Sequence, residues 1–236
     1  MMQKPIAVRA LKNCFDFFRA TFRTRSVSAE LTPLYRERVR DHLAALHTVP
    51  TDGCVFFGDS IMQGLDVLSV TQAGVNYGIG SDTTGGVLRR IPAYCSVLER
   101  CDCVVVAVGV NDCHKRGVRN ALESYSRILG IIPPDVRVVV SAVLPVDGSI
   151  SRDLRQLSRK VREFNAGLMS VVSGSQREDV EYVNHDPSFC VAGESGFLRS
   201  ELHVGDGVHL NLLGYDMWAL NLAAAVRTQR ERHRSG

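Results

Sequence analysis

Three short, predominantly apolar runs constrain the fold of this chain more than any other feature. They are Cys54 to Phe57, Val104 to Val108 and Val136 to Val143, and a weaker fourth run is Val180 to Val183. Strands that are apolar without alternation are buried on both faces, which is typical of a parallel sheet covered by helices. The sequence therefore predicts an α/β domain in which such strands alternate with helices.

Two segments carry apolar residues at intervals of three and four, the spacing that places side chains on one face of a helix. The first stripe comprises Leu154, Leu157, Val161, Phe164, Leu168 and Val171, and the second comprises Leu212, Tyr215, Trp218, Leu222 and Val226. We expect the first helix to cover the sheet. The second is expected to end the chain, with Asn211 as its N-cap.

The chain has 236 residues, of which 45% are hydrophobic and 22% charged. These values suit one soluble domain with a sizeable core. We predict a main domain over residues 31–236 and a basic N-terminal arm over residues 1–30, helical or partly disordered. The segment from Ser26 to Pro33 is the expected separator.

The net charge of +3 comes from the two ends of the chain. Residues 1–25 hold six basic side chains and one acidic one, and residues 227–234 hold four basic and one acidic, which leaves the central body acidic. An enzyme that acts on nucleic acid would carry basic residues along its binding face. We therefore predict no nucleic-acid partner.

The N-terminal arm also interleaves apolar and basic residues. Leu11, Phe15, Phe18 and Phe22 recur at helical spacing, which could lay a basic amphipathic helix on an anionic membrane surface. The alternatives are a helix packed on its own domain or a frayed tail, and we favour these. With no apolar run of ~18 residues and no secretory signal pattern, we expect a cytoplasmic protein, with peripheral membrane contact as the alternative.

The cysteine pattern predicts neither disulfides nor a metal site. The count of seven is odd, and Cys54, Cys101 and Cys103 stand in or beside apolar runs, where a reduced thiol behaves as a small buried hydrophobe. The Cys101/Cys103 spacing lacks the pattern of a zinc ribbon, and Cys113 beside His114 supplies too few ligands.

Ser60 is the first candidate for chemistry. It follows the strand Cys54 to Phe57 in the run Gly58-Asp59-Ser60 and precedes a helix expected near Ile61. Open α/β sheets bind their ligands at the carboxyl ends of the strands, so the position suits a nucleophile. Asp and Ser are also ordinary turn and cap residues, so this run alone is weak evidence.

A serine nucleophile needs a base, and His209 is the best placed of the seven histidines. It ends the run Gly205-Asp206-Gly207-Val208-His209, immediately before the last helix, and Asp206 can reach back to orient its imidazole. The competing interpretation is a helix-capping loop with a surface histidine.

Two further segments offer donors for an oxyanion. The run from Gly109 to Asp112 follows the strongest strand and would place the Asn111 amide at the same sheet edge as Ser60. The run from Asn76 to Thr84 contains glycines that let backbone N–H groups turn toward a ligand. It matches neither the dinucleotide fingerprint nor a phosphate loop.

Taken in order, four blocks resemble the SGNH hydrolases of the GDSL superfamily: Gly58 to Ser60, Gly78 to Thr84, Gly109 to Asp112 and Asp206 to His209. The resemblance implies a flavodoxin-like three-layer αβα sandwich with about five parallel strands. It also implies a serine esterase without metal or organic cofactor.

By this resemblance, Ser60 is the nucleophile, His209 the base and Asp206 its orienting partner. The oxyanion hole combines the Ser60 N–H, the Ser81 N–H and the Asn111 side chain. The family usually has glycine where this chain has Ser81, so that donor remains only if Ser81 adopts the required φ and ψ. We expect Asp59 and Asp112 to brace loops by accepting backbone hydrogen bonds.

The predicted reaction is carboxylic ester hydrolysis through an acyl-enzyme on Ser60, with a small-molecule or carbohydrate ester as substrate. Short acyl or O-acetyl groups are favoured, and the segment from Asp186 to Val204 is expected to shape the pocket. The alternatives are a catalytically silent binding module and a membrane-peripheral lipase or acyltransferase. The sequence leaves the oligomeric state open.

Overall fold

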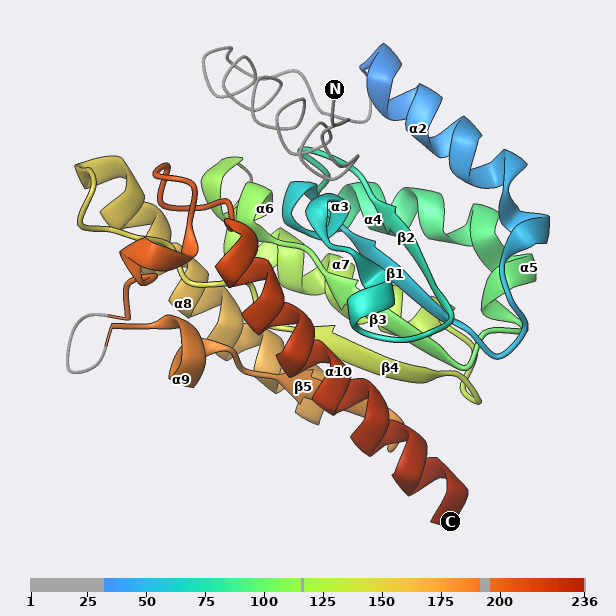
Figure 1. Ribbon diagram of the computed structural model, residues 1–236. Helices are drawn as coiled ribbons and strands as arrows, with labels where there is room; N and C mark the ends of the chain where they lie inside the picture. The colour runs from blue at the N-terminus through green and yellow to red at the C-terminus, as the bar shows by residue number, and fades with distance from the viewer. Residues whose placement is uncertain (1–31, 116, 192–195, 236) are drawn as a thin grey trace, which may run out of the picture.

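The central feature of the structure, a computed structural model that describes residues 32–115, 117–191 and 196–235, is a parallel sheet of five strands (Figure 1). The strands are β1 (Cys54–Gly58), β2 (Gly74–Gly78), β3 (Cys103–Ala107), β4 (Arg137–Ser141) and β5 (Val180–Val183). Their order is β2-β1-β3-β4-β5, which is the flavodoxin-like order. The predicted fold class is confirmed.

Burial explains why three strands stood out in the sequence. Strands β1, β3 and β4 are the inner strands and every residue in them is buried. Strand β5 lies at one edge and is only half-buried, so its apolar run is weaker. The run Val136 to Val143 extends past β4 at both ends, because only Arg137–Ser141 pairs with neighbours.

Helices cover both faces of the sheet. On one face α7 (Val118–Ile131) contacts both α4 (Thr84–Arg90) and α8 (Arg152–Ser173), and α10 (Leu212–Ser235) crosses β4 and β5 on the other face (Figure 1). The remaining helices are α2 (Pro33–Ala44), α3 (Ser60–Gly64), α5 (Cys95–Leu98), α6 (Val110–Lys115) and α9 (Asp186–Phe189), with 3-10 turns at Leu46–Thr48, Val67–Ser69, Ile91–Tyr94 and Ser200–Leu202.

Both helices that the apolar stripes predicted are present. Helix α8 buries Leu157, Val161, Phe164 and Leu168 against the sheet. Asn211 caps α10 as expected, because its Oδ1 accepts the Gly214 N–H at 3.0 Å.

The N-terminal arm, residues 1–30, falls outside the described residues, so its helix, its packing and its membrane contact stay predictions. Within the described ranges, no helix is long and apolar enough to cross a membrane. The six cysteines in that part of the chain are all free: Cys54, Cys95, Cys101, Cys103, Cys113 and Cys190.

The carboxyl ends of three neighbouring strands bring the polar blocks together. Because β1, β2 and β3 are parallel and in register, Gly58 lies beside both Gly78 and Ala107. The segments that follow these strands carry Ser60 and Asn111, in the first turns of α3 and α6, and Ser81, in the loop before α4. Residues that are far apart in the sequence therefore meet at one edge of the sheet.

Candidate active site

Ser60 stands at the sharp junction between β1 and α3. The backbone of Asp59 is extended, and its carboxylate caps α3 by accepting the Ile61 N–H at 3.0 Å. Ser60 is then the first residue of the helix, and the first N–H groups of a helix have no acceptor within it. The junction thus presents both a hydroxyl and a backbone donor at the sheet edge.

His209 reaches Ser60 from the other end of the chain. Its Nε2 lies 3.0 Å from Ser60 Oγ, and its Nδ1 lies 2.6 Å from Asp206 Oδ2. When Nδ1–H donates a hydrogen bond to the carboxylate, Nε2 carries no proton. It can then accept a hydrogen bond from the serine hydroxyl. The three residues named from the sequence form one continuous chain of hydrogen bonds.

The Asp206 carboxylate is fixed by its own loop. Its Oδ1 accepts the N–H groups of Val208 and His209, both at 2.9 Å, while Oδ2 faces the imidazole. Burial raises the pKa of this carboxyl, but the hydrogen bonds from His209 and Val208 outweigh burial and hold the pKa below its ordinary value. Asp206 therefore stays ionised at neutral pH.

A second histidine, His203, supports this loop. The sequence did not single it out. Its Nδ1 accepts the N–H groups of Gly205 at 2.9 Å and Gly207 at 3.2 Å, and its Nε2 lies 3.3 Å from Asp147. Gly207 has a φ of +77°, and a Cβ there would lie 3.2 Å from the Asp147 carbonyl oxygen. The two braced amides flank Asp206.

Asn111 occupies the first turn of α6, beyond the end of β3. Its Nδ2 donates one hydrogen bond to the backbone carbonyl of Asp82, at 2.9 Å. A primary amide nitrogen has two hydrogens, so a second donor remains for a ligand. The contact ties the third block of the site directly to the second.

The expectation that Asp59 and Asp112 brace loops is confirmed. Asp59 accepts the Ile61 N–H, and Asp112 accepts both the N–H and the hydroxyl of Thr84, each at 2.9 Å. Asp112 thereby joins α6 to the start of α4.

Ser81 adopts the left-handed conformation, which a glycine would reach without strain. Its φ is +62°, a region that costs a non-glycine residue roughly 1–2 kcal/mol. The neighbouring amides are used, since Gly80 N–H donates to Gln63 Oε1 at 2.6 Å and Asp82 N–H donates to the Ile79 carbonyl at 3.1 Å. Across the part of the chain that the structure describes, the Ser81 N–H has no acceptor.

Substitutions at Ser81 should therefore separate backbone shape from side-chain chemistry. We expect Ser81→Gly to keep turnover within about threefold, because glycine accepts a positive φ. Ser81→Val should lower kcat by at least about tenfold, because a β-branched residue resists this conformation and would withdraw the N–H. Steady-state kinetics on both variants test this, and equal activities would argue against a backbone donor at Ser81.

Asp59 is fully buried beneath the serine, and burial raises the pKa of its carboxyl to about 7. Because the folded pKa exceeds the ordinary value of 3.8, the folded protein binds an extra proton between these two pH values. Stability is therefore lost as pH rises toward 7, and the full penalty applies above it.

Asp59→Asn removes this penalty while keeping an oxygen for the Ile61 N–H. We expect the variant to be more stable than the parent at pH 8, on the order of a few kcal/mol, and the gain to shrink toward pH 5. Thermal unfolding at the two pH values measures this difference. A gain that is independent of pH would contradict the buried-carboxyl explanation.

Another serine–histidine contact exists but lacks the features of a catalytic pair. Ser141 Oγ lies 2.8 Å from His185 Nε2, and Trp218 Nε1 donates to the same nitrogen at 3.3 Å. Both Ser141 and His185 are fully buried, and burial lowers the pKa of His185 to about 3. Because this serine is sealed from solvent, the contact belongs to the packing of the turn before α9 on β4, with Trp218 of α10 against it.

A hollow of about 240 Å³ opens beside the Asp206 side of the triad. Its polar lining comes from Asp206, His114, Ser151 and Asp153, and Leu154 and Leu157 of α8 supply apolar surface. The role of the segment from Asp186 to Val204 in shaping a pocket stays a prediction, and residues 192–195 within it lie outside the described residues.

Comparisons with known proteins identify the family and the fold. The sequence profile of the GDSL-like lipase/acylhydrolase family matches residues 56–217, more than half of the chain. Subunit alpha1 of the platelet-activating factor acetylhydrolase IB of Rattus norvegicus is 28% identical over 169 residues, which cover 68% of this chain and 69% of the relative.

Two solved structures share the fold at lower identity. A GDSL-like lipase from Bacteroides thetaiotaomicron superposes with a TM-score of 0.68 at 19% identity, covering 80% of this chain and 97% of its own. An acetylxylan esterase from Geobacillus stearothermophilus gives 0.59 at 14% identity, covering 74% and 94%.

Proposed function

Because this chain belongs to the GDSL-like lipase/acylhydrolase family and is therefore a hydrolase of ester bonds, we propose that it works through an acyl-enzyme on Ser60. The observation that carries the proposal is the continuous contact from Ser60 Oγ through His209 to Asp206, at 3.0 Å and 2.6 Å. This is the arrangement by which a weakly nucleophilic hydroxyl is activated.

In the first half of the reaction, Ser60 Oγ attacks the ester carbonyl carbon and its proton passes to His209 Nε2. The carbonyl oxygen becomes an oxyanion, which the Ser60 N–H, the Ser81 N–H and the free hydrogen of Asn111 Nδ2 stabilise. The bond to the alkoxy group then breaks, and His209 returns the proton to the departing alcohol. Ionised Asp206 stabilises the imidazolium that forms between these steps.

In the second half, water replaces the alcohol. His209 Nε2 takes a proton from the water as its oxygen attacks the acyl carbon, and the same donors hold the second oxyanion. The bond to Ser60 Oγ breaks, and the proton on His209 returns to that oxygen. The products are the free acid and the regenerated enzyme.

The proposed substrates are short-acyl esters, and acetyl esters in particular. The names of two similar proteins support this class, since one is an acetylhydrolase and the other an acetylxylan esterase. The hollow beside Asp206 combines carboxylate, hydroxyl and imidazole groups, which can pair with the hydroxyl groups of a carbohydrate alcohol. We place the alcohol portion of the ester there.

A fluorophosphonate probe and a series of p-nitrophenyl esters test the proposal. We expect the probe to label Ser60, and we expect kcat/KM for the acetate to exceed that for the octanoate by at least tenfold. Folded protein that neither reacts with the probe nor turns over any ester would refute the enzyme and favour a binding module. Labelling with a preference for long chains would refute only the substrate class.

Removing the Asn111 side chain should weaken the oxyanion hole without touching the triad. We expect Asn111→Ala to lower kcat by about a hundredfold to a thousandfold while KM changes little, because the amide is proposed to act mainly on the transition state. Steady-state kinetics with p-nitrophenyl acetate provide the values. A loss confined to KM would show that Asn111 binds the ground state instead.

A further inference from the structure

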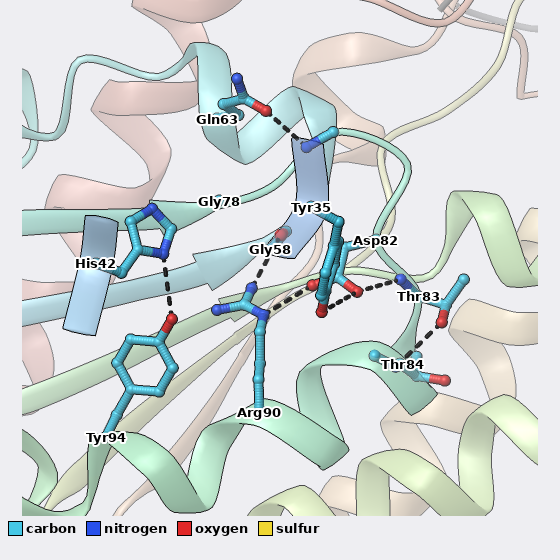
Figure 2. A network of polar contacts seen from close by, with 12 residues as sticks. Tyr35, His42, Gly58, Gln63, Gly78, Asp82, Thr83, Thr84, Arg90 and Tyr94 are labelled. Atoms are coloured by element: carbon cyan, nitrogen blue, oxygen red, sulfur yellow. Dashed lines mark hydrogen bonds and ion pairs between the residues drawn. The ribbon is translucent and has the colours of Figure 1, made fainter. Parts of the chain in front are cut away.

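A buried arginine lies behind the proposed oxyanion hole. Arg90, at the end of α4, is 5% exposed, and its Nε donates to Asp82 Oδ2 at 2.9 Å, where Asp82 is completely buried. Figure 2 shows the guanidinium between the Asp82 carboxylate and the backbone of Gly58, with Tyr35 of α2 completing the cluster. None of these side chains takes part in the steps proposed above.

Asp82 connects the arginine to the second and third blocks. Its carboxylate accepts from Arg90, from the Thr83 N–H at 2.8 Å and from the Tyr35 hydroxyl at 3.2 Å. Its backbone carbonyl accepts from Asn111 Nδ2 at 2.9 Å. The residue that anchors the loop thus also aims the Asn111 amide.

Arg90 connects the same cluster to the first block. Its Nη2 lies 3.4 Å from the carbonyl oxygen of Gly58, two residues before Ser60. Asp82 directly follows Ser81, whose N–H is the second proposed donor. The guanidinium therefore contacts the first and second blocks directly, through Gly58 and Asp82. It reaches the third block through one further hydrogen bond, from Asn111 to Asp82.

A buried ion pair of this kind adds little to the free energy of unfolding. Desolvating two charges costs about as much as their attraction returns, and apolar replacements of similar volume are often neutral or stabilising. The guanidinium also lies over the rings of Phe57 and Tyr94, with 5.2 Å and 5.8 Å to the ring centroids. An arginine so placed presents a planar fork that can serve two acceptors at fixed angles, which a lysine cannot do.

We propose that Arg90, acting through Asp82, is the positioning residue that sets the relative placement of the three oxyanion donors. The proposal rests on the ester-hydrolase function of Ser60. It assigns to Arg90 no contact with substrate, because the arginine acts by holding Asp82, and Asp82 by holding Ser81 and Asn111.

The test variant is Arg90→Lys, which keeps the charge opposite Asp82 but removes the fork. We expect kcat for p-nitrophenyl acetate to fall by about tenfold with KM within twofold, after normalising to sites titrated with the fluorophosphonate. Arg89→Lys, an exposed neighbour on the same helix, is the matched control and should leave both constants unchanged.

A double-mutant cycle separates positioning from a merely structural role. If Arg90 positions the donors, Arg90→Lys should cost clearly less than tenfold in an Asn111→Ala background, because one of the three donors that it positions is gone. A tenfold loss in both backgrounds would overturn the proposal, as would unchanged kcat with a lowered Tm. A wild-type protein that fails to label or turn over would refute the proposed function instead.

A second variant covers the case in which Arg90→Lys does not fold. Asp82→Asn/Arg90→Gln replaces the ion pair with two neutral amides that can still bond to each other, and it avoids a lone buried charge. If the double variant folds and its kcat is reduced by tenfold or more, the result supports the positioning role. If the double variant folds and keeps the wild-type kcat, the result overturns the positioning role.

Discussion

Replacing Ser60 with alanine is expected to lower kcat by about four to six orders of magnitude, because the proposed acyl-enzyme can no longer form. The fold should be unaffected. Alanine suits the first position of α3, the Asp59 cap remains, and only the contact with His209 is lost.

Ser141→Ala is the matched control for this variant. Ser141 also contacts a histidine, at 2.8 Å, but it is sealed in the core. We expect it to keep full turnover per titrated site and to lose about 1 kcal/mol of stability with its hydrogen bond. Activity retained in Ser60→Ala would mean that another group is the nucleophile.

Asp206→Asn should lower kcat by about 10⁴-fold through the imidazole tautomer. Asparagine can keep an oxygen for the N–H groups of Val208 and His209, and it then turns its NH₂ group toward His209 Nδ1. Nδ1 must become an acceptor, so the ring proton moves to Nε2. A protonated Nε2 faces Ser60 Oγ and cannot accept its proton.

Asp66→Asn controls for the loss of a loop carboxylate. Asp66 Oδ1 accepts the N–H two residues later, at 3.1 Å, just as Asp206 Oδ1 does at 2.9 Å, but Asp66 contacts no histidine in the described structure. The control should keep wild-type turnover. If Asp206→Asn retained more than about a tenth of the activity, the orienting role of Asp206 would be wrong.

The sequence predicted those parts of the molecule that follow from local pattern. Continuous apolar runs marked the inner strands, the three-and-four spacing marked α8 and α10, and Asn211 marked the start of α10. The order of four short blocks predicted the family, and the strand ends explain why those blocks converge. The roles of Ser60, His209 and Asp206 remain predictions that their geometry supports.

Contacts that depend on three-dimensional packing were beyond the sequence. Nothing in the local pattern distinguishes the buried Arg90 from the exposed Arg89 beside it, and His203 resembles any loop histidine until Asp147 is brought against it. The left-handed φ of Ser81 was left open for the same reason. A serine in that conformation is held there by its surroundings, which the sequence alone does not specify.

The separation of Ser60 and His209 by 149 residues has a consequence for the protein's synthesis. At ribosomal rates of about 5 to 20 residues per second, Ser60 is made roughly 7 to 30 s before His209. The proposed activation of Ser60 by His209 therefore requires that the loop before α10 has been made and has packed against the end of β1.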